Sequence, residues 1–181
     1  MTAMPETSLN DLRRLIRDVP DFPEKGILFK DITPLLQDAA ALAASIRALA
    51  GRAERPDAVV AIESRGFIFG TGLALHWKVP LVPARKFGKL PGKRLRERYA
   101  LEYGEDSLEI HADALVHGAR VAVVDDLLAT GGTAHATARL VERLGAKVDS
   151  ILFLIELKGL GGREALLPRR VEALLDYEVT A

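Results

Sequence analysis

The sequence predicts an α/β fold in which helices flank a doubly wound, mostly parallel sheet. Continuous apolar runs of strand length alternate with helix-like segments along the chain, and such alternation is typical of βαβ units. Hydrophobic residues make up 49% of the chain and charged residues 28%, which is the balance of a globular domain. Because 181 residues fit one domain better than two, we expect residues 1–181 to form a single domain.

The N-terminal part predicts two helices joined by an irregular stretch. Ser8 can cap a first helix that has its apolar side chains on one face. Residues 18–36 contain three prolines and predict an ordered loop or a short extended segment. Asp38 can cap a second helix, which Gly51 ends.

Apolar runs predict the strands of the sheet. A run such as "AVVAI" offers apolar side chains to both faces, as a parallel strand buried between helices requires. The predicted strands are residues 58–62, 79–83, 107–111, 120–126, 150–157 and 171–178, of which 107–111 alternates like an edge strand and 120–126 is central. The predicted helices between them are residues 66–77 and 133–144.

Residues 85–106, "RKFGKLPGKRLRERYALEYGED", differ in character from the rest. They hold three glycines, one proline and many charges, without a clear period. We interpret the segment as a long mobile loop, with a β-ribbon as the alternative. Loops of this length inside compact domains are usually functional or disordered.

Composition excludes several classes of function. The 25 basic and 25 acidic residues cancel, so nothing supports a nucleic-acid surface or a polybasic membrane surface. The absence of cysteine excludes disulfides and thiolate metal sites. No apolar run approaches the ~20 residues of a membrane helix, and the N-terminus lacks the apolar core of a signal peptide. We expect a cytoplasmic protein.

The polar residues that follow the predicted strands gather at one edge of the sheet. Ligands of open α/β sheets bind outside the carboxyl ends of the strands. Residues 63–66, residues 85–86 and residues 125–133 all fall at that edge. Three clusters that are distant in sequence therefore predict one site.

Residues 123–134, "VVDDLLATGGTA", place a small-residue loop between a strand and a helix. Its glycines permit backbone angles that turn several N–H groups inward, and the helix dipole favours an anion there. The loop fits a phosphate monoester, whereas a tight turn with a threonine N-cap is the alternative, and the loop alone leaves both open. Because the loop lacks lysine, a nucleoside-triphosphate loop is disfavoured.

Asp125 and Asp126 come directly before this loop. Ionised carboxylates accept hydrogen bonds, so they suit hydroxyl groups or a metal ion. A ribose 5-phosphate offers a phosphate to the loop and hydroxyls to the two acids. Two alternatives stay open: exposed acids that end a strand, and the Mg²⁺ site of a phospho-acceptor receiver domain, which would leave the loop unused.

These twelve residues resemble the phosphoribosyl-pyrophosphate (PRPP) binding motif of type I phosphoribosyltransferases. The resemblance extends over nearly the whole chain and narrows to the members that use adenine. It is carried by "VPDFPEKGILFKDITPLL", "ESRGFIFG", "RKFGKLPG", "LEYGEDSLEIH" and "LIELKGLGGRE". It implies a pentosyltransferase of purine salvage that makes AMP and pyrophosphate from adenine and PRPP. It also implies a small N-terminal hood, about residues 1–35, and a mobile lid loop, about residues 86–106.

The resemblance also assigns the PRPP site. Asp125 and Asp126 would contact the ribose hydroxyls and favour the positive charge that builds on the sugar. Arg85, Lys86 and Lys89 would hold the pyrophosphate, although such cations are most often solvated surface. Mg²⁺ would be held mainly by PRPP, with no direct protein ligand expected. The residues that would hold the 5-phosphate are Ala129, Thr130, Gly131, Gly132 and Thr133.

The base pocket would come from "GILFKD" and "ESRG". The resemblance implies that Phe29 stacks on the purine and that the Leu28 backbone pairs with the adenine edge. Arg65 would meet N7 through its backbone and also belong to the nucleotide-binding set. Backbone pairing explains the choice of adenine, because hypoxanthine and guanine present the opposite donor pattern and leave buried groups unpaired. The family also implies a cis peptide at "ESRG"; a helix with Ser64 as its N-cap is the plain reading.

Glu102 and Tyr103 lie in "LEYG", within the expected lid. The resemblance implies that the closed lid excludes water, that Glu102 is the general base toward adenine, and that Tyr103 packs over the ligand. It further implies a homodimer. Two rivals stay open, namely a phosphoribosyltransferase for another base, such as xanthine, and a PRPP sensor that regulates transcription. The zero net charge and the intact "LEYG" disfavour the sensor.

Overall fold

The computed structural model describes residues 8–100 and 105–179. Its centre is a seven-stranded sheet, and the strands in spatial order are β5 (Arg94–Ala100), β6 (Glu105–His111), β4 (Leu81–Lys86), β3 (Ala58–Ile62), β7 (Arg120–Leu128), β8 (Lys147–Lys158) and β9 (Val171–Glu178). The five strands from β4 to β9 in this order run parallel. Strand β6 is antiparallel to both β4 and β5. The predicted mostly parallel sheet is confirmed.

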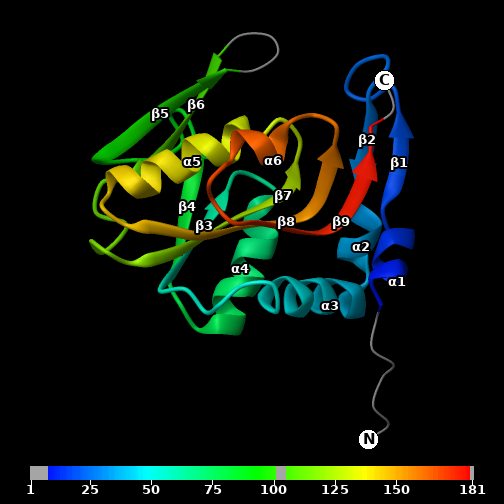
Figure 1. Ribbon diagram of the computed structural model, residues 1–181, viewed down its shortest axis with the longest axis horizontal. Helices are drawn as coiled ribbons and strands as arrows, with labels where there is room; N and C mark the ends of the chain where they lie inside the picture. The colour runs from blue at the N-terminus through cyan, green and yellow to red at the C-terminus, as the bar shows by residue number, and fades with distance from the viewer. Residues whose placement is uncertain (1–7, 101–104, 180–181) are drawn as a thin grey trace, which may run out of the picture.

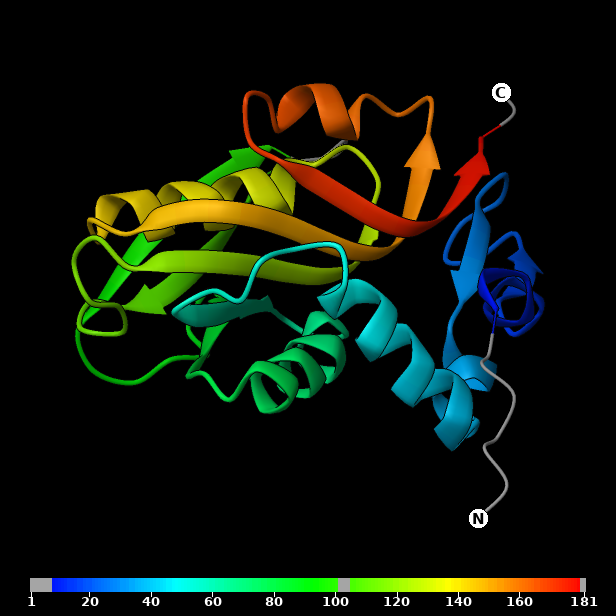
Figure 2. The same ribbon diagram turned by 60° about the horizontal axis from the view of Figure 1, so that its bottom comes forward.

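Helices cover both faces of the sheet, as Figures 1 and 2 show. Helices α3 (Ala39–Ala50) and α4 (Gly66–Trp77) pack on one face, and α5 (Gly132–Arg143) and α6 (Gly162–Ala165) lie on the other. Successive strand residues face opposite sides, so β3 sends Val59 into the α3/α4 core and Val60 into the α5 core. This two-sided burial explains why the strand sequences are continuous apolar runs.

The N-terminal part forms a small separate layer beside β9 and α3 (Figure 1). It consists of α1 (Leu9–Arg14), β1 (Arg17–Pro20), β2 (Leu28–Asp31) and α2 (Thr33–Gln37), with β1 and β2 paired antiparallel. Ser8 caps α1, as predicted. The Lys30 ammonium lies 4.3 Å from the centre of the Tyr177 ring on β9, which ties this layer to the sheet.

Several predicted elements agree closely with the structure. The predicted bounds of β3 and α4 match, and Asp38 and Gly51 are the two ends of α3. Residues 18–36 are more regular than predicted, because they hold β1, β2 and α2. The short helix α6 was not predicted at all. Within the described residues, no helix is long and apolar enough to cross a membrane.

The antiparallel half of the sheet corrects two predictions. Residues 107–111 belong to β6, which is paired on both sides and is therefore not an edge strand. The edge strand is β5, which pairs with β6 over its whole length. Much of residues 85–106 is thus a β-ribbon, the alternative to the long loop.

Candidate functional site

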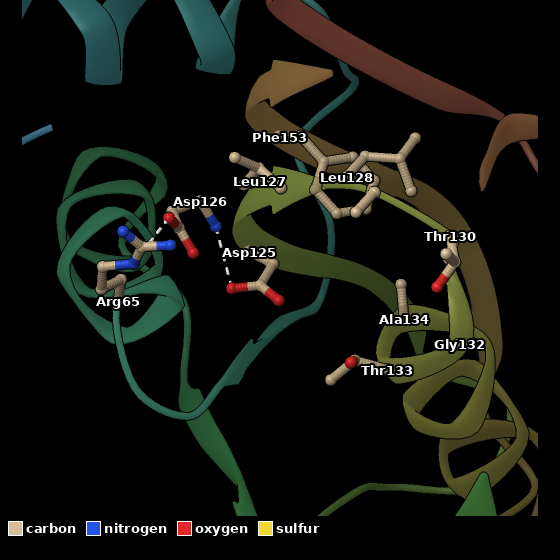
Figure 3. Close-up of a pocket in the computed structure, with 12 residues that line it drawn as sticks. Arg65, Asp125, Asp126, Leu127, Leu128, Thr130, Gly132, Thr133, Ala134 and Phe153 are labelled. Atoms are coloured by element: carbon tan, nitrogen blue, oxygen red, sulfur yellow. Dashed lines mark hydrogen bonds and ion pairs between the residues drawn. The ribbon is translucent and has the colours of Figure 1, made fainter. Parts of the chain in front are cut away.

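The carboxyl ends of β3, β4 and β7 meet at one edge of the sheet, and two adjoining pockets open there. The first, of about 250 Å³, is lined by residues 125–134 together with Arg65 and Phe153 (Figure 3). The second, of about 450 Å³, is lined by Glu63, Ser64, Arg65, Lys86, Tyr99, Asp106, Asp125, Asp126 and Thr133. The pockets share Arg65, both aspartates and Thr133, so they form two halves of one site.

The small-residue loop lines the first pocket and leads directly into α5. Gly131 is the N-cap of α5, with φ of 83°, a left-handed backbone that glycine adopts without steric cost. The threonine N-cap that was the alternative is therefore wrong. The residues of the first turn of α5 line this pocket, and the N-terminus of a helix favours an anion.

Asp125 and Asp126 lie between the loop and Arg65, as Figure 3 shows. Asp126 is 5% exposed, so the alternative of two exposed acids is wrong. The Asp126 backbone N–H donates to Asp125 Oδ1 at 2.9 Å. Burial and the neighbouring Asp126 charge raise the pKa of Asp125 well above its ordinary value. Burial also raises the pKa of Asp126, although the Arg65 charge opposes the shift.

One oxygen of Asp126 has no hydrogen-bond donor among the described residues. This atom, Oδ2, is fully buried. Arg65 Nε lies 2.8 Å from it, so the two form an ion pair, but not with the geometry of a hydrogen bond. A buried acceptor without a donor is costly and rare. The atom is therefore a candidate partner for a ligand hydroxyl.

The turn after β3 supplies Glu63, Ser64 and Arg65. The Glu63–Ser64 peptide bond is cis, as the resemblance implied. The N-cap of α4 is Arg65, without a side-chain hydrogen bond, so the reading with Ser64 as N-cap is wrong.

The Glu63 carboxylate binds the end of β4. Arg85 donates to both of its oxygens, at 3.0 and 3.3 Å, and the Lys86 N–H donates at 2.9 Å. The Arg85 hydrogen bonds hold the pKa of Glu63 below its ordinary value. Glu63 thus fixes the segment that carries two of the predicted pyrophosphate cations.

Two predicted base-pocket residues lie on β2. The Arg65 guanidinium carbon is 5.0 Å from the centre of the Phe29 ring, so this ring lies next to the site. Phe22 packs edge-on against it at 5.1 Å. Leu28 is half exposed. The contacts of Arg65 with both Phe29 and Asp126 connect the base-pocket candidates to the acids.

The structure gathers most of the predicted residues, with some exceptions. Lys86 lines the second pocket, whereas Arg85 and Lys89 line neither pocket. Glu102 and Tyr103 lie outside the described residues. Tyr99 and Asp106 face the second pocket and were not predicted. For Tyr99 the one sequence signal was its spacing of four residues from Leu95 in "RLRERYA", which a strand would place on the same face. For Asp106 the sequence offered no signal.

Metal coordination by the protein alone finds little support in the described part of the chain. Within residues 8–100 and 105–179, no three side chains of aspartate, glutamate or histidine gather closely enough to hold a metal ion. Asp125 and Asp126 do offer carboxylate oxygens. Mg²⁺ is commonly held by one or two carboxylates together with substrate phosphates, and this donor set fits such an ion.

Comparisons with known proteins place these features in a family. Residues 29–165 match the model of the phosphoribosyl transferase domain. The adenine phosphoribosyltransferase of Caldanaerobacter subterraneus is 58% identical over 161 residues, which cover 88% of this chain and 93% of that protein. The crystal structure of the adenine phosphoribosyltransferase of Thermoanaerobacter pseudethanolicus superposes with a TM-score of 0.91 at 52% identity, covering 94% of this chain and 100% of that one.

A more distant relative carries ligands. The adenine phosphoribosyltransferase of Saccharomyces cerevisiae, in complex with adenine and an imino-altritol bisphosphate, superposes with a TM-score of 0.88 at 40% identity. The match covers 92% of this chain and 98% of that one.

Proposed function

The chain belongs to the phosphoribosyltransferase family, and on that premise we propose that it transfers the 5-phosphoribosyl group of PRPP to N9 of adenine. The products are AMP and pyrophosphate, and the reaction serves purine salvage. The protein is an enzyme of the glycosyltransferase class. One observation carries the proposal: the small-residue loop at the start of α5 and Asp126, whose buried Oδ2 accepts no hydrogen bond from the described residues, line the same pocket.

The loop from Ala129 to Thr133 binds the 5-phosphate. The loop and the first turn of α5 line the pocket, where free backbone N–H groups and the positive end of a helix dipole favour an anion. The Thr130 and Thr133 hydroxyls supply further donors. A dianionic phosphate is thus stabilised without any lysine in the loop.

Asp125 and Asp126 bind the sugar. Their oxygens accept hydrogen bonds from the 2′- and 3′-hydroxyls, and Asp126 Oδ2 is a buried acceptor that needs such a donor. As the bond to pyrophosphate breaks, positive charge builds on the ribose ring. Negative charges fixed in a poorly solvated pocket stabilise that transition state more than water would.

Arg85, Lys86 and Lys89 hold the pyrophosphate, and Lys86 already lines the second pocket. Bound Mg²⁺ would neutralise part of the negative charge on the leaving group. PRPP would supply most of the oxygen ligands of this ion, and no direct protein ligand is expected.

Phe29, Leu28 and Arg65 form the adenine site. Phe29 supplies a face for stacking, and its ring lies beside Arg65 at the edge of the site. The Leu28 backbone pairs with the 6-amino group and N1, and the Arg65 backbone meets N7. Wrong bases leave these backbone groups unpaired at a cost of about 1–3 kcal/mol each.

Glu102 is the general base that accepts the N9 proton of adenine, and Tyr103 packs over the nucleotide from the lid. This role rests on the motif "LEYG" alone. The hood of about residues 1–35, the lid of about residues 86–106, the homodimer and the cytoplasmic location likewise stay predictions from the sequence.

The direct test supplies the protein with PRPP, Mg²⁺ and one base at a time: adenine, hypoxanthine, guanine, xanthine or orotate. We expect AMP from adenine and little turnover of the others. Turnover of another base in place of adenine would refute the specificity and leave the phosphoribosyl transfer intact. No turnover of any base, with PRPP bound, would favour the sensor.

A second test separates chemistry from binding. Glu102→Gln should lower kcat by about 10²-fold or more while the Kd of PRPP stays unchanged. Glu178→Gln, at an exposed position near the C-terminus, is the matched control. An unchanged kcat would remove Glu102 from acid–base catalysis.

A further inference from the structure

One wall of the second pocket carries a three-residue cluster of which the reaction as described uses only Lys86. Lys86 Nζ lies 3.2 Å from Asp106 Oδ2, and the Tyr99 hydroxyl donates to the same oxygen at 3.1 Å. All three residues line the pocket together with Asp125 and Thr133. A carboxylate is an unexpected group in the half of the site that would receive pyrophosphate.

The Asp106 carboxylate is held in place by donors other than Lys86. Tyr99 and Asp106 are directly opposite each other on β5 and β6, so their side chains share one face of the ribbon. The Ser107 N–H donates to the second oxygen, Oδ1, at 2.7 Å. The carboxylate therefore keeps its position whether or not Lys86 is bound to it.

The protonation states support this arrangement. Burial alone would raise the pKa of Asp106, but the hydrogen bonds from Ser107, Lys86 and Tyr99 outweigh it and keep the pKa below its ordinary value. Burial and the Asp106 charge raise the pKa of Tyr99 to about 12, so Tyr99 keeps the proton that it donates.

Lys86 is the movable member of the cluster. Its side chain is 57% exposed, against 24% for Asp106, and an ammonium on a flexible four-carbon stem changes partner easily. Exposed or half-exposed ion pairs are weak. A ligand that carries several negative charges in the same pocket would therefore take Lys86 away from Asp106.

We propose that Asp106 is a positioning residue that holds the Lys86 ammonium in the pyrophosphate half of the site before a ligand binds and recaptures it when pyrophosphate leaves. This inference rests on the proposed function. Asp106 keeps the lysine in the pocket, yet it competes with the ligand for it. The competition limits the affinity for pyrophosphate and so favours release of the product.

The test measures binding of magnesium pyrophosphate by calorimetry to the wild type and to Asp106→Asn. Asparagine has nearly the same shape. Its one oxygen can still accept from the Ser107 N–H, and its amide NH2 can donate to the Tyr99 hydroxyl oxygen, but it no longer holds Lys86 by charge. We expect Asp106→Asn to bind pyrophosphate about two- to fivefold more tightly, with stronger product inhibition and a lower KM for PRPP. A substitution that merely damaged the fold would weaken binding instead.

Two further variants show whether the effect passes through Lys86. Asp113→Asn removes the same charge from an exposed position beyond the other end of β6, and it should leave the affinity unchanged. In a Lys86→Met background, Asp106→Asn should no longer bind pyrophosphate much more tightly than the protein with Asp106. Equal or weaker binding by Asp106→Asn, or an equal gain in both backgrounds, would overturn the proposal. A wild type that binds neither pyrophosphate nor PRPP would instead refute the proposed function.

Discussion

Gly162, the first residue of α6, lies directly against the phosphate loop, and replacing it by alanine should disturb that loop. An ideal Cβ at Gly162 would lie 2.1 Å from the Ala129 carbonyl oxygen and 2.9 Å from Leu128 Cδ1. The oxygen is a backbone atom, so it cannot rotate away as a side chain would. To reach even 3.0 Å, the shortest separation that real Cβ atoms tolerate, it must move by ~1 Å.

The cost of Gly162→Ala follows from this geometry. Overpacking of a close contact destabilises by about 1–3 kcal/mol, which lowers the Tm of a protein of this size by about 2–12 °C. A displacement of ~1 Å in a group that positions the substrate can reduce the rate by about 10²-fold. We therefore expect kcat/KM for PRPP to fall by at least about tenfold, because Ala129 belongs to the loop that holds the 5-phosphate.

Calorimetric melting and steady-state kinetics with PRPP varied measure the two effects. The matched control is Gly51→Ala at the end of α3, where the nearest atoms to an added Cβ are 3.6 Å away and φ is −70°. This control should change stability by less than about 1 kcal/mol and leave kcat/KM unchanged. If Gly162→Ala behaves like Gly51→Ala in both assays, the close approach of α6 to the loop does not position it.

Three further predictions concern the acids and the base pocket. The pKa of Asp125 is raised in the folded protein, so its ionisation opposes folding and stability falls as the pH rises from the unfolded to the folded pKa. Asp125→Asn should then stabilise by roughly 0.5–2 kcal/mol at pH 7 and lose that pH dependence, while PRPP binding weakens. The pKa of Glu63 is lowered in the folded protein, so its ionised carboxylate contributes to stability above the unfolded pKa, and this contribution is lost as the pH falls through the folded pKa. Glu63→Gln should therefore destabilise the protein by ~1 kcal/mol at pH 7 and not in acid. Melting at both pH values would show this. Phe29→Ala should raise the KM for adenine, and a change in the KM for PRPP alone would contradict the stacking role.

The parallel strands were predictable because nearly every position in them is buried and therefore apolar. Residues 58–62 match β3 residue for residue, since helices cover both faces of that strand and leave no polar position. The anion loop was predictable for a related reason. Only a few residue types permit the turn from β7 into α5, and Gly131 holds the left-handed backbone there.

The β5–β6 ribbon was harder to predict because its strands are stabilised by partners that lie far away in the sequence. Strand β5 holds four charged residues among seven, and Glu97 binds both Arg139 and Arg143 of α5 at 2.8 Å. Those partners are distant in sequence, so local charge indicates a solvated loop. Tyr99 and Asp106 were missed for the same reason, because they meet only through the register of the ribbon.

The two aspartates show why a buried acid can lie beside an anion loop. Their burial opposes ionisation, as the raised pKa values of both acids indicate, and one oxygen of Asp126 accepts no hydrogen bond from the described part of the chain. The same poorly solvated surroundings make a fixed negative charge act more strongly on a cation. The two carboxylates therefore stabilise a ribose ring that becomes positive during transfer, while the 5-phosphate of the same sugar stays in the loop. The folded protein therefore loses stability because it holds a negative charge in place before the substrate binds, and the transition state needs that charge. Asp125→Asn should recover this lost stability.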